Sequence, residues 1–124
     1  MRGCPHVMTL KTSLLAMVLV GAVPALAGTP DETAFLAENG AAMKKMMAGM
    51  EIKPSGDVDR DFVAMMIPHH QGAIDMAQAE MRYGRNEQLR RLAQEIIVSQ
   101  SQEIPAMRLA IGQPLAPSDS PLPR

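Results

Sequence analysis

The chain has 124 residues, twelve of them basic and thirteen acidic, for a formal net charge of −1. That length suits one small domain. The near-neutral charge excludes the basic patch of a nucleic-acid-binding domain and the polybasic surface of a membrane-bound one. The sulfur content is unusual, with twelve methionines and a single cysteine, whereas leucine is ordinarily the commonest residue.

Residues 1–27 have the form of a secretory signal peptide. Two basic residues come first, an apolar run follows at 13–23, and an A-x-A pattern at 25–27 marks a cleavage site. The apolar run is too short to cross a bilayer comfortably, which makes an uncleaved anchor the weaker alternative. Cleavage removes Cys4 and leaves ten basic against thirteen acidic residues, with no disulfide. We therefore expect a periplasmic or secreted protein with no stable membrane insertion.

Residues 28–112 predict an all-α domain, a small antiparallel bundle of three to four helices. The first helix is expected from Asp31 to Met50, because Thr29 can cap it and Pro30 suits its first position. Its apolar residues recur at three- and four-residue spacing. Four of them are methionines: Met43, Met46, Met47 and Met50.

The second helix is expected from about Asp57 to Tyr83, after a loop that contains Pro54 and Gly56. Pro68 falls inside this helix. A proline in a helix interior removes one backbone hydrogen bond and costs roughly 3 kcal/mol, so we expect a kink there.

The third helix is expected from Glu87 to about Ile111, with Asn86 as its cap and Gly112 as its stop. Pro105 lies inside it and predicts a second kink. Residues 113–124 are rich in proline and are expected to form a disordered tail.

The short turn between the second and third helices predicts that they lie antiparallel. Folding the chain near Arg85 brings His70 level with Gln100, and Met66 level with Glu103. A sulfur residue and a histidine thus face two polar residues across the hairpin.

The same reasoning applies to the first and second helices. Folding the chain near Lys53 brings Met43 level with residues 63–64, close to Met65 and Met66. Three segments are therefore expected to bring sulfur or polar groups to one height of the bundle.

The only histidines after residue 27 are the adjacent pair His69 and His70. Neighbouring side chains on a helix point about 100° apart, so the pair binds one ion only if the helix is distorted at Pro68. A histidine beside apolar residues is more often a core or surface residue than a ligand, although imidazole is the commonest metal-binding side chain.

Methionine usually fills gaps in a core, and that role suffices for Met81 and Met50. It explains less well the cluster in the first helix and the pair at 65–66. Thioethers suit Cu(I), and imidazole suits Cu(II) as well, whereas zinc prefers thiolate, imidazole and carboxylate. Methionine and histidine without cysteine therefore favour copper. Gln100 and Glu103 are expected to support a histidine by hydrogen bonds rather than to bind metal.

Enzymatic motifs are lacking in the sequence. A ferritin-like di-iron site needs several inward carboxylates and E-x-x-H pairs, and the residues three before His69 and His70 are Met66 and Ile67. No nucleophile motif and no glycine-rich phosphate loop stands out. We therefore expect a protein that is not an enzyme.

The segment M-M-I-P-H-H-Q-G-A-I-D-M-A at 65–77 and the segment L-R-R-L-A-Q-E-I-I-V-S-Q-S-Q-E-I-P-A-M at 89–107 resemble the bacterial domain of unknown function three hundred and five. The resemblance covers most of residues 57–111 and implies a ferritin-like bundle that is usually exported. Some members are periplasmic copper-binding proteins linked to copper tolerance, with methionine and histidine ligands. Carried over by motif, the resemblance points to Met66, His69, His70, Met76 and Met107.

Two departures from the family pattern affect this transfer. The third helix starts with N-E-Q-L at 86–89, where the family commonly has H-P-E-L, so a third histidine is missing. Pro105 interrupts the segment that positions Met107.

The sequence thus predicts an exported protein that binds Cu(I), Cu(II) or both, for copper buffering, tolerance or transfer. The candidate ligands are His69, His70, Met66, Met76, Met107, Met65, Met43 and Met47, with Gln100 and Glu103 as supporting residues. The alternative is a helical interaction module whose histidine pair is structural and binds no metal. The small size of the domain also favours a homo-oligomer.

Overall fold

The computed structural model describes residues 28–115, which form three α-helices and contain no strand. They are α1 (Pro30–Met50), α2 (Val58–Tyr83) and α3 (Glu87–Ala110). The expected all-α bundle is confirmed. The predicted signal peptide, and the tail from residue 116 onward, lie outside the described residues. No helix within residues 28–115 combines the length and the apolar character that crossing a membrane requires.

Each helix begins at a residue whose side chain caps it. The oxygens of Thr29, Asp57 and Asn86 accept hydrogen bonds from backbone N–H groups of the first turn at 2.9–3.2 Å. These bonds satisfy donors that a helix start otherwise leaves unpaired. Both α2 and α3 continue across their internal prolines, Pro68 and Pro105.

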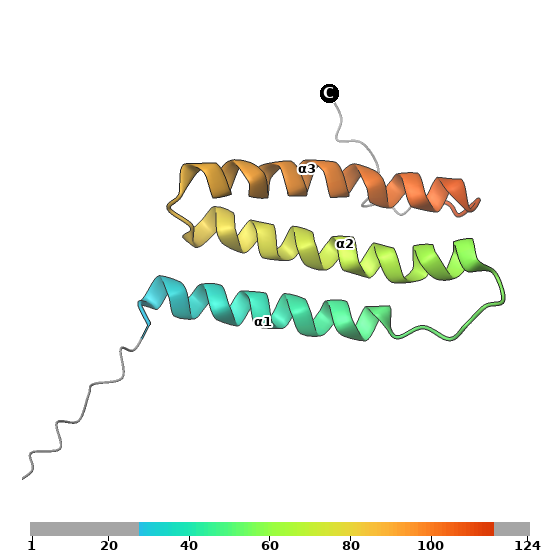
Figure 1. Ribbon diagram of the computed structural model, residues 1–124, viewed down its shortest axis with the longest axis horizontal. Helices are drawn as coiled ribbons and strands as arrows, with labels where there is room; N and C mark the ends of the chain where they lie inside the picture. Colours follow the sequence, from blue (N-terminus) through green and yellow to red (C-terminus); the bar gives the residue numbers. More distant parts are fainter. Residues whose placement is uncertain (1–27, 116–124) are drawn as a thin grey trace, which may run out of the picture.

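The three helices lie side by side in one layer, with α2 in the middle (Figure 1). Helix α2 packs against both neighbours, whereas no Cα atom of α1 comes within 8 Å of a Cα atom of α3. Consecutive helices run antiparallel (Figure 1). This arrangement gives the described part of the protein two broad faces.

Two glycines allow α1 and α2 to approach closely. A Cβ atom built at Gly72 would lie 2.7 Å from the Cβ atom of Met46, and one at Gly49 would lie 2.7 Å from the Cβ atom of Pro68. Real Cβ atoms do not approach so closely, so the backbones are nearer than any larger residue permits. These two contacts fix how α1 and α2 are aligned.

Polar contacts on one side of the α1–α2 contact support the same alignment. Lys45 Nζ lies 3.7 Å from the carboxylate of Asp75. Further toward the start of α1, Glu38 accepts a hydrogen bond from the hydroxyl of Tyr83 at 2.7 Å and pairs with the Arg82 guanidinium.

The predicted alignment of the first two helices was wrong. Because Met46 lies beside Gly72, Met43 is level with Met76 and not with residues 63–64. The difference exceeds three helical turns. Its cause is the loop at 51–57, which is not helical: an extended residue advances about 3.3 Å, against 1.5 Å in a helix.

The extended loop therefore runs beside the first turns of α2, which project past the end of α1 (Figure 1). The Ser55 backbone N–H holds the loop there by donating to the carboxylate of Asp61 at 3.0 Å. At the other turn, the Arg90 guanidinium donates to the backbone carbonyl of Met81 at 2.8 Å. The predicted alignment of α2 with α3 is correct to within one turn, since His70 bonds to Glu103.

The buried core is small. Its apolar residues, each at most 9 % exposed, are Ala42, Met46, Val63, Ile74, Ala77, Ala79, Ala93 and Ile104. Half of them are alanines, and no large side chain among the described residues is fully buried. Small residues let the helices pack closely, but they remove little apolar surface from water.

The contact at Gly72 predicts opposite effects for two alanine substitutions. Gly72→Ala forces α1 and α2 apart, and overpacking of this kind costs roughly 1–3 kcal/mol. Gly40→Ala is the matched control, because nothing lies within 4 Å of its added methyl group; it should gain about 0.5–1 kcal/mol from helix propensity. Thermal unfolding followed by circular dichroism measures both. A rise in Tm for both variants would contradict the described contact.

Tyr83 provides a spectroscopic probe of the contact with α1, since the chain has one tyrosine and no tryptophan. The hydrogen bond to Glu38, followed by burial, raises the pKa of Tyr83 above 10.0. The hydrogen bonds from Tyr83 and then Arg82 lower the pKa of Glu38 below 4.5.

Alkaline titration of the phenol absorbance should therefore show Tyr83 ionising at higher pH than free tyrosine. Glu38→Gln should lower that pKa, whereas Glu51→Gln, at the far end of α1, should leave it unchanged. The stabilisation from Tyr83 is present below its unfolded pKa and is lost as pH rises through the folded value. The stabilisation from Glu38 is present above its unfolded pKa and is lost as pH falls through its pKa in the folded protein. An unshifted phenol would refute the pairing.

Candidate metal site

The two broad faces of the layer differ in chemistry. On α1, Glu38 and Lys45 point to one face, where they pair with α2. Leu36, Met43 and Met47 lie at the opposite side of the same helix, because residues seven and eleven apart share a side. All three are exposed.

The same division continues on α2 and α3. Phe62, Met66, His69 and Met76 recur at helical spacing on the side of α2 away from its ion pairs. Phe62 and Met107 line one hollow of about 230 Å³, which places the Met107 side of α3 on this face. That side of α3 also carries three exposed apolar residues, Leu89, Leu92 and Ile96.

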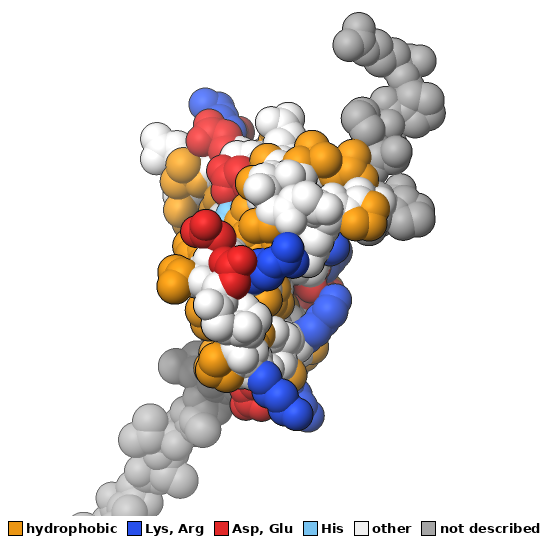
Figure 2. Space-filling model, turned by 90° about the vertical axis from the view of Figure 1, so that its right-hand side faces the viewer, with side chains coloured by type: hydrophobic (Ala, Val, Ile, Leu, Met, Phe, Trp, Pro, Cys, Tyr) orange, Lys and Arg blue, Asp and Glu red, His pale blue; other side chains and the backbone are white. Residues whose placement is uncertain are grey.

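We name this surface the methionine face. It consists of Leu36, Met43, Met47, Phe62, Met66, His69, Met76, Leu89, Leu92, Ile96 and Met107. Viewed from the end of the layer, hydrophobic side chains lie along the left edge, with acidic ones among them, and also at the upper right, while Lys and Arg lie mostly toward the right (Figure 2). Six of the eight predicted ligands belong to the methionine face, although none of the three helices carries more than three of them.

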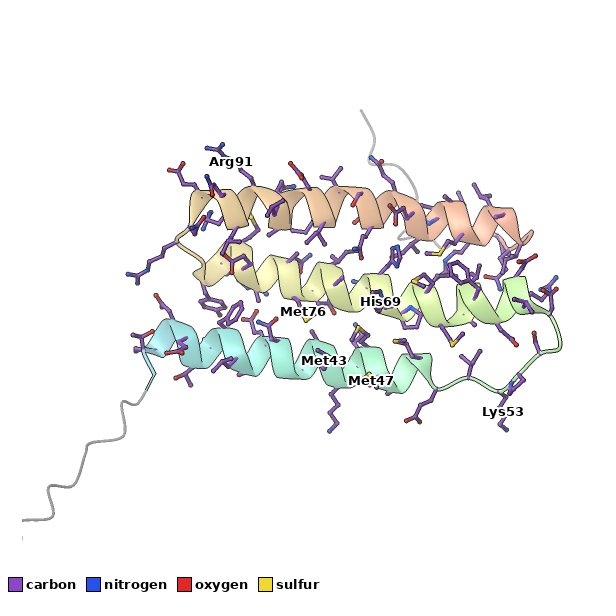
Figure 3. The ribbon with its side chains drawn as sticks, viewed as in Figure 1. Met43, Met47, Lys53, His69, Met76 and Arg91 are labelled. Carbon is purple, nitrogen blue, oxygen red and sulfur yellow. The ribbon has the colours of Figure 1, made fainter. Side chains whose placement is uncertain are left out.

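The six predicted ligands on this face do not form one cluster. They are spread over about 20 Å along α2. Met43 is level with Met76, and Met47 is level with His69 (Figure 3). These four residues line the two sides of the α1–α2 contact, and we call them the compact set. Met66 is one helical turn before His69 on the same helix, toward the end of the layer where Met107 lies.

The thioethers of α1 are in water rather than in the core. Met43 is 45 % exposed and Met47 is 55 % exposed. They are one helical turn apart, which brings their Cβ atoms to about 5–6 Å. Met76, across the contact, is half-buried. Methionine has three rotatable bonds, so each of these sulfur atoms can take several positions around the contact.

His70 connects α2 to α3. Its Nδ1 lies 2.9 Å from the Met66 carbonyl oxygen, and its Nε2 lies 2.6 Å from a carboxylate oxygen of Glu103. The side chain is only 12 % exposed. Both ring nitrogens are thus engaged with protein oxygens, and ligation of a metal ion by His70 requires one of the two contacts to open.

His69 has the opposite environment. It is exposed, and its ring makes no hydrogen bond within residues 28–115; its contact is with the His70 ring, whose centroid is 6.0 Å away. The two adjacent imidazoles thus differ in availability: His69 can bind an external ligand through either nitrogen, whereas His70 holds two helices together.

Two further candidates remain. Met65 is about one helical turn before His69 on α2, beyond the end of α1 and about 16 Å along the axis from Met76. Gln100 has a buried side-chain oxygen without a hydrogen-bond partner among the described residues, and it bonds to neither histidine. Leaving a buried acceptor unpaired costs roughly 1–3 kcal/mol.

Among residues 28–115 there is no group of three or more His, Cys, Asp or Glu side chains placed to hold a metal ion. Thioethers are not among those four donor types. The case for the set of Met43, Met47, Met76 and His69 therefore rests on the metal preference of thioether and imidazole donors, which suit copper.

Sequence reasoning missed Gly49 and Gly72, which set the position of this group. The available signal was a glycine inside a helical pattern, which indicates close packing when it is not a helix end. Gly72 follows two residues after the histidine pair.

Within residues 28–115, these features define a helical domain that carries thioethers and one exposed imidazole on a single face. The chain belongs to the family described as domain of unknown function (DUF305), which matches residues 21–111. The resemblance drawn from the M-I-P-H-H segment is thereby confirmed. No curated protein matches the chain significantly.

The different environments of the two histidines predict different stability effects. His70→Ala leaves the Met66 carbonyl and the Glu103 carboxylate without their donor and should cost roughly 1–3 kcal/mol. His69→Ala removes an exposed side chain and should change the free energy of unfolding by less than about 0.5 kcal/mol. Urea denaturation of the metal-free protein measures both values. Equal losses would show that His70 does not link the helices.

Proposed function

We propose that this protein is an exported, non-enzymatic copper-binding protein that buffers copper or passes it on. The observation that carries the proposal is the compact set on the methionine face: two exposed thioethers on α1, opposite Met76 and a free imidazole on α2. An exposed thioether gains little from packing, so these positions are better explained by metal binding than by core filling.

The residues we assign as ligands are Met43, Met47, Met76 and His69. Thioethers are soft, neutral donors, so they stabilise Cu(I) without deprotonation. The imidazole adds a stronger donor that also accepts Cu(II). Bound in this way, copper is held at a surface from which a partner can remove it. That accessibility suits buffering and transfer.

Met65, Met66 and Met107 form a second group of candidates. Met65 and Met66 are each about one helical turn from His69 on α2, and Met107 is on α3, so this group adjoins the assigned ligands at His69. His70 and Glu103 stabilise the α2–α3 pair on which both groups depend, which is the supporting role predicted for Glu103. The ferritin-like classification, the kinks at Pro68 and Pro105, and the periplasmic or secreted location belong to this proposal.

One specific observation favours a second candidate function. The double hydrogen bond of His70 to α2 and α3 is what a purely structural histidine makes. Together with the broad apolar surface, it supports the alternative of a helical interaction module that binds no metal. The two functions differ in whether the purified protein binds copper.

Competition with a Cu(I) chelator tests copper binding directly. The protein should bind Cu(I) stoichiometrically. The triple variant Met43→Leu, Met47→Leu, Met76→Leu should bind at least about tenfold more weakly, which corresponds to about 1.4 kcal/mol. Leucine nearly preserves volume, so the fold is retained.

Met81→Leu is the matched control, because Met81 is a half-buried methionine of α2 outside the methionine face. Its affinity should equal that of the wild type. Equal affinity in the triple variant would refute the assigned ligands. A wild-type protein that binds no more copper than an unrelated helical protein would refute the function.

A further inference from the structure

The three-helix layer leaves one side of α2 without a packing partner. Its two edges are covered by α1 and α3, which do not reach each other. The side between them carries Phe62, His69 and Met76, none of which is buried. No further helix among residues 28–115 covers this side. Nothing in the described part of the chain therefore packs over the small, alanine-rich core at the methionine face.

The exposed large apolar residues are concentrated on this face. Seven belong to it: Leu36, Met43, Met47, Phe62, Leu89, Leu92 and Ile96. Side chains of this size, about half exposed, leave about 100 Å² each in contact with water, or about 700 Å² together. That exceeds the apolar patch of a typical monomer and approaches the roughly 800 Å² that each partner contributes to a stable interface.

The charge distribution permits contact between two copies of this face. The ion pairs of α1 with α2, including Lys45–Asp75, lie on the opposite face of the layer. At the methionine face, the Glu103 carboxylate is bonded to His70. Glu32 and Glu80 line one hollow near the α2–α3 turn, and Asp59 lines the hollow that holds Phe62 and Met107. These other acidic side chains lie toward the two ends of the face, where the polar rim of an interface would be.

We propose that the methionine face is the interface of a homodimer. Each copy contributes the same surface, as in an isologous dimer, and the ridges of α1 and α3 on one copy cover the uncovered side of α2 on the other. The dimer supplies the apolar burial that one copy lacks. It does not rest on the proposed copper function, because Leu36, Leu89 and Leu92 carry no donor atom for a metal.

Size-exclusion chromatography with light scattering, performed with a metal chelator present, tests the dimer. The wild-type protein should have twice the mass of one chain. Leu92→Lys should shift the equilibrium toward monomer, raising the dimer dissociation constant at least about tenfold. Leu92 is 53 % exposed, so the substitution leaves the core intact. Leu36→Lys on α1 should have the same effect.

Val98→Lys is the matched control. Val98 is on the same helix with similar exposure, 48 %, but it points away from the methionine face. It should remain dimeric. A wild-type protein that is monomeric at every concentration would overturn the proposal, as would equal dissociation in Leu92→Lys and Val98→Lys. A face occupied only by a different macromolecule would overturn it too. Circular dichroism confirms that each variant is folded, and a failure to bind copper leaves the result unaffected.

Discussion

The close approach of α1 to α2 at Gly49 and Gly72 is the constraint on which the described structure depends. Without a side chain at either position, Pro68 and Met46 fit against the opposing backbone. This contact fixes the register of the two helices within a fraction of a turn. The register in turn places Met43 opposite Met76. A larger residue at Gly72 would push the two helices apart and would therefore also move Met43 away from Met76.

The layer that results separates structural roles from exposed donor groups. Ion pairs and the Tyr83–Glu38 hydrogen bond hold the helices together on one face, while His70 connects α2 to α3 from inside. The opposite face then holds exposed apolar side chains and the imidazole of His69, which makes no hydrogen bond among the described residues. Adjacent histidines can differ so much because a helix turns about 100° per residue.

Sequence patterns predicted the helices well, because the caps at Thr29 and Asn86 and the spacing of apolar residues are local signals. The α2–α3 alignment was also predictable, since a three-residue turn leaves little freedom. The α1–α2 alignment was not, because the seven residues of the loop are not helical and the close contact at Gly72 joins distant parts of the chain. The split between His69 and His70 depends on the same tertiary geometry, so a helical pattern cannot show it.

X-ray absorption at the copper edge of the Cu(I)-loaded protein tests the central claim most directly, because it identifies the atoms bound to the metal. A methionine-face site predicts a shell dominated by sulfur with one nitrogen, and loss of most sulfur scattering when Met43, Met47 and Met76 are leucine. A shell of nitrogen and oxygen alone, or a sulfur shell unchanged in that variant, would contradict it.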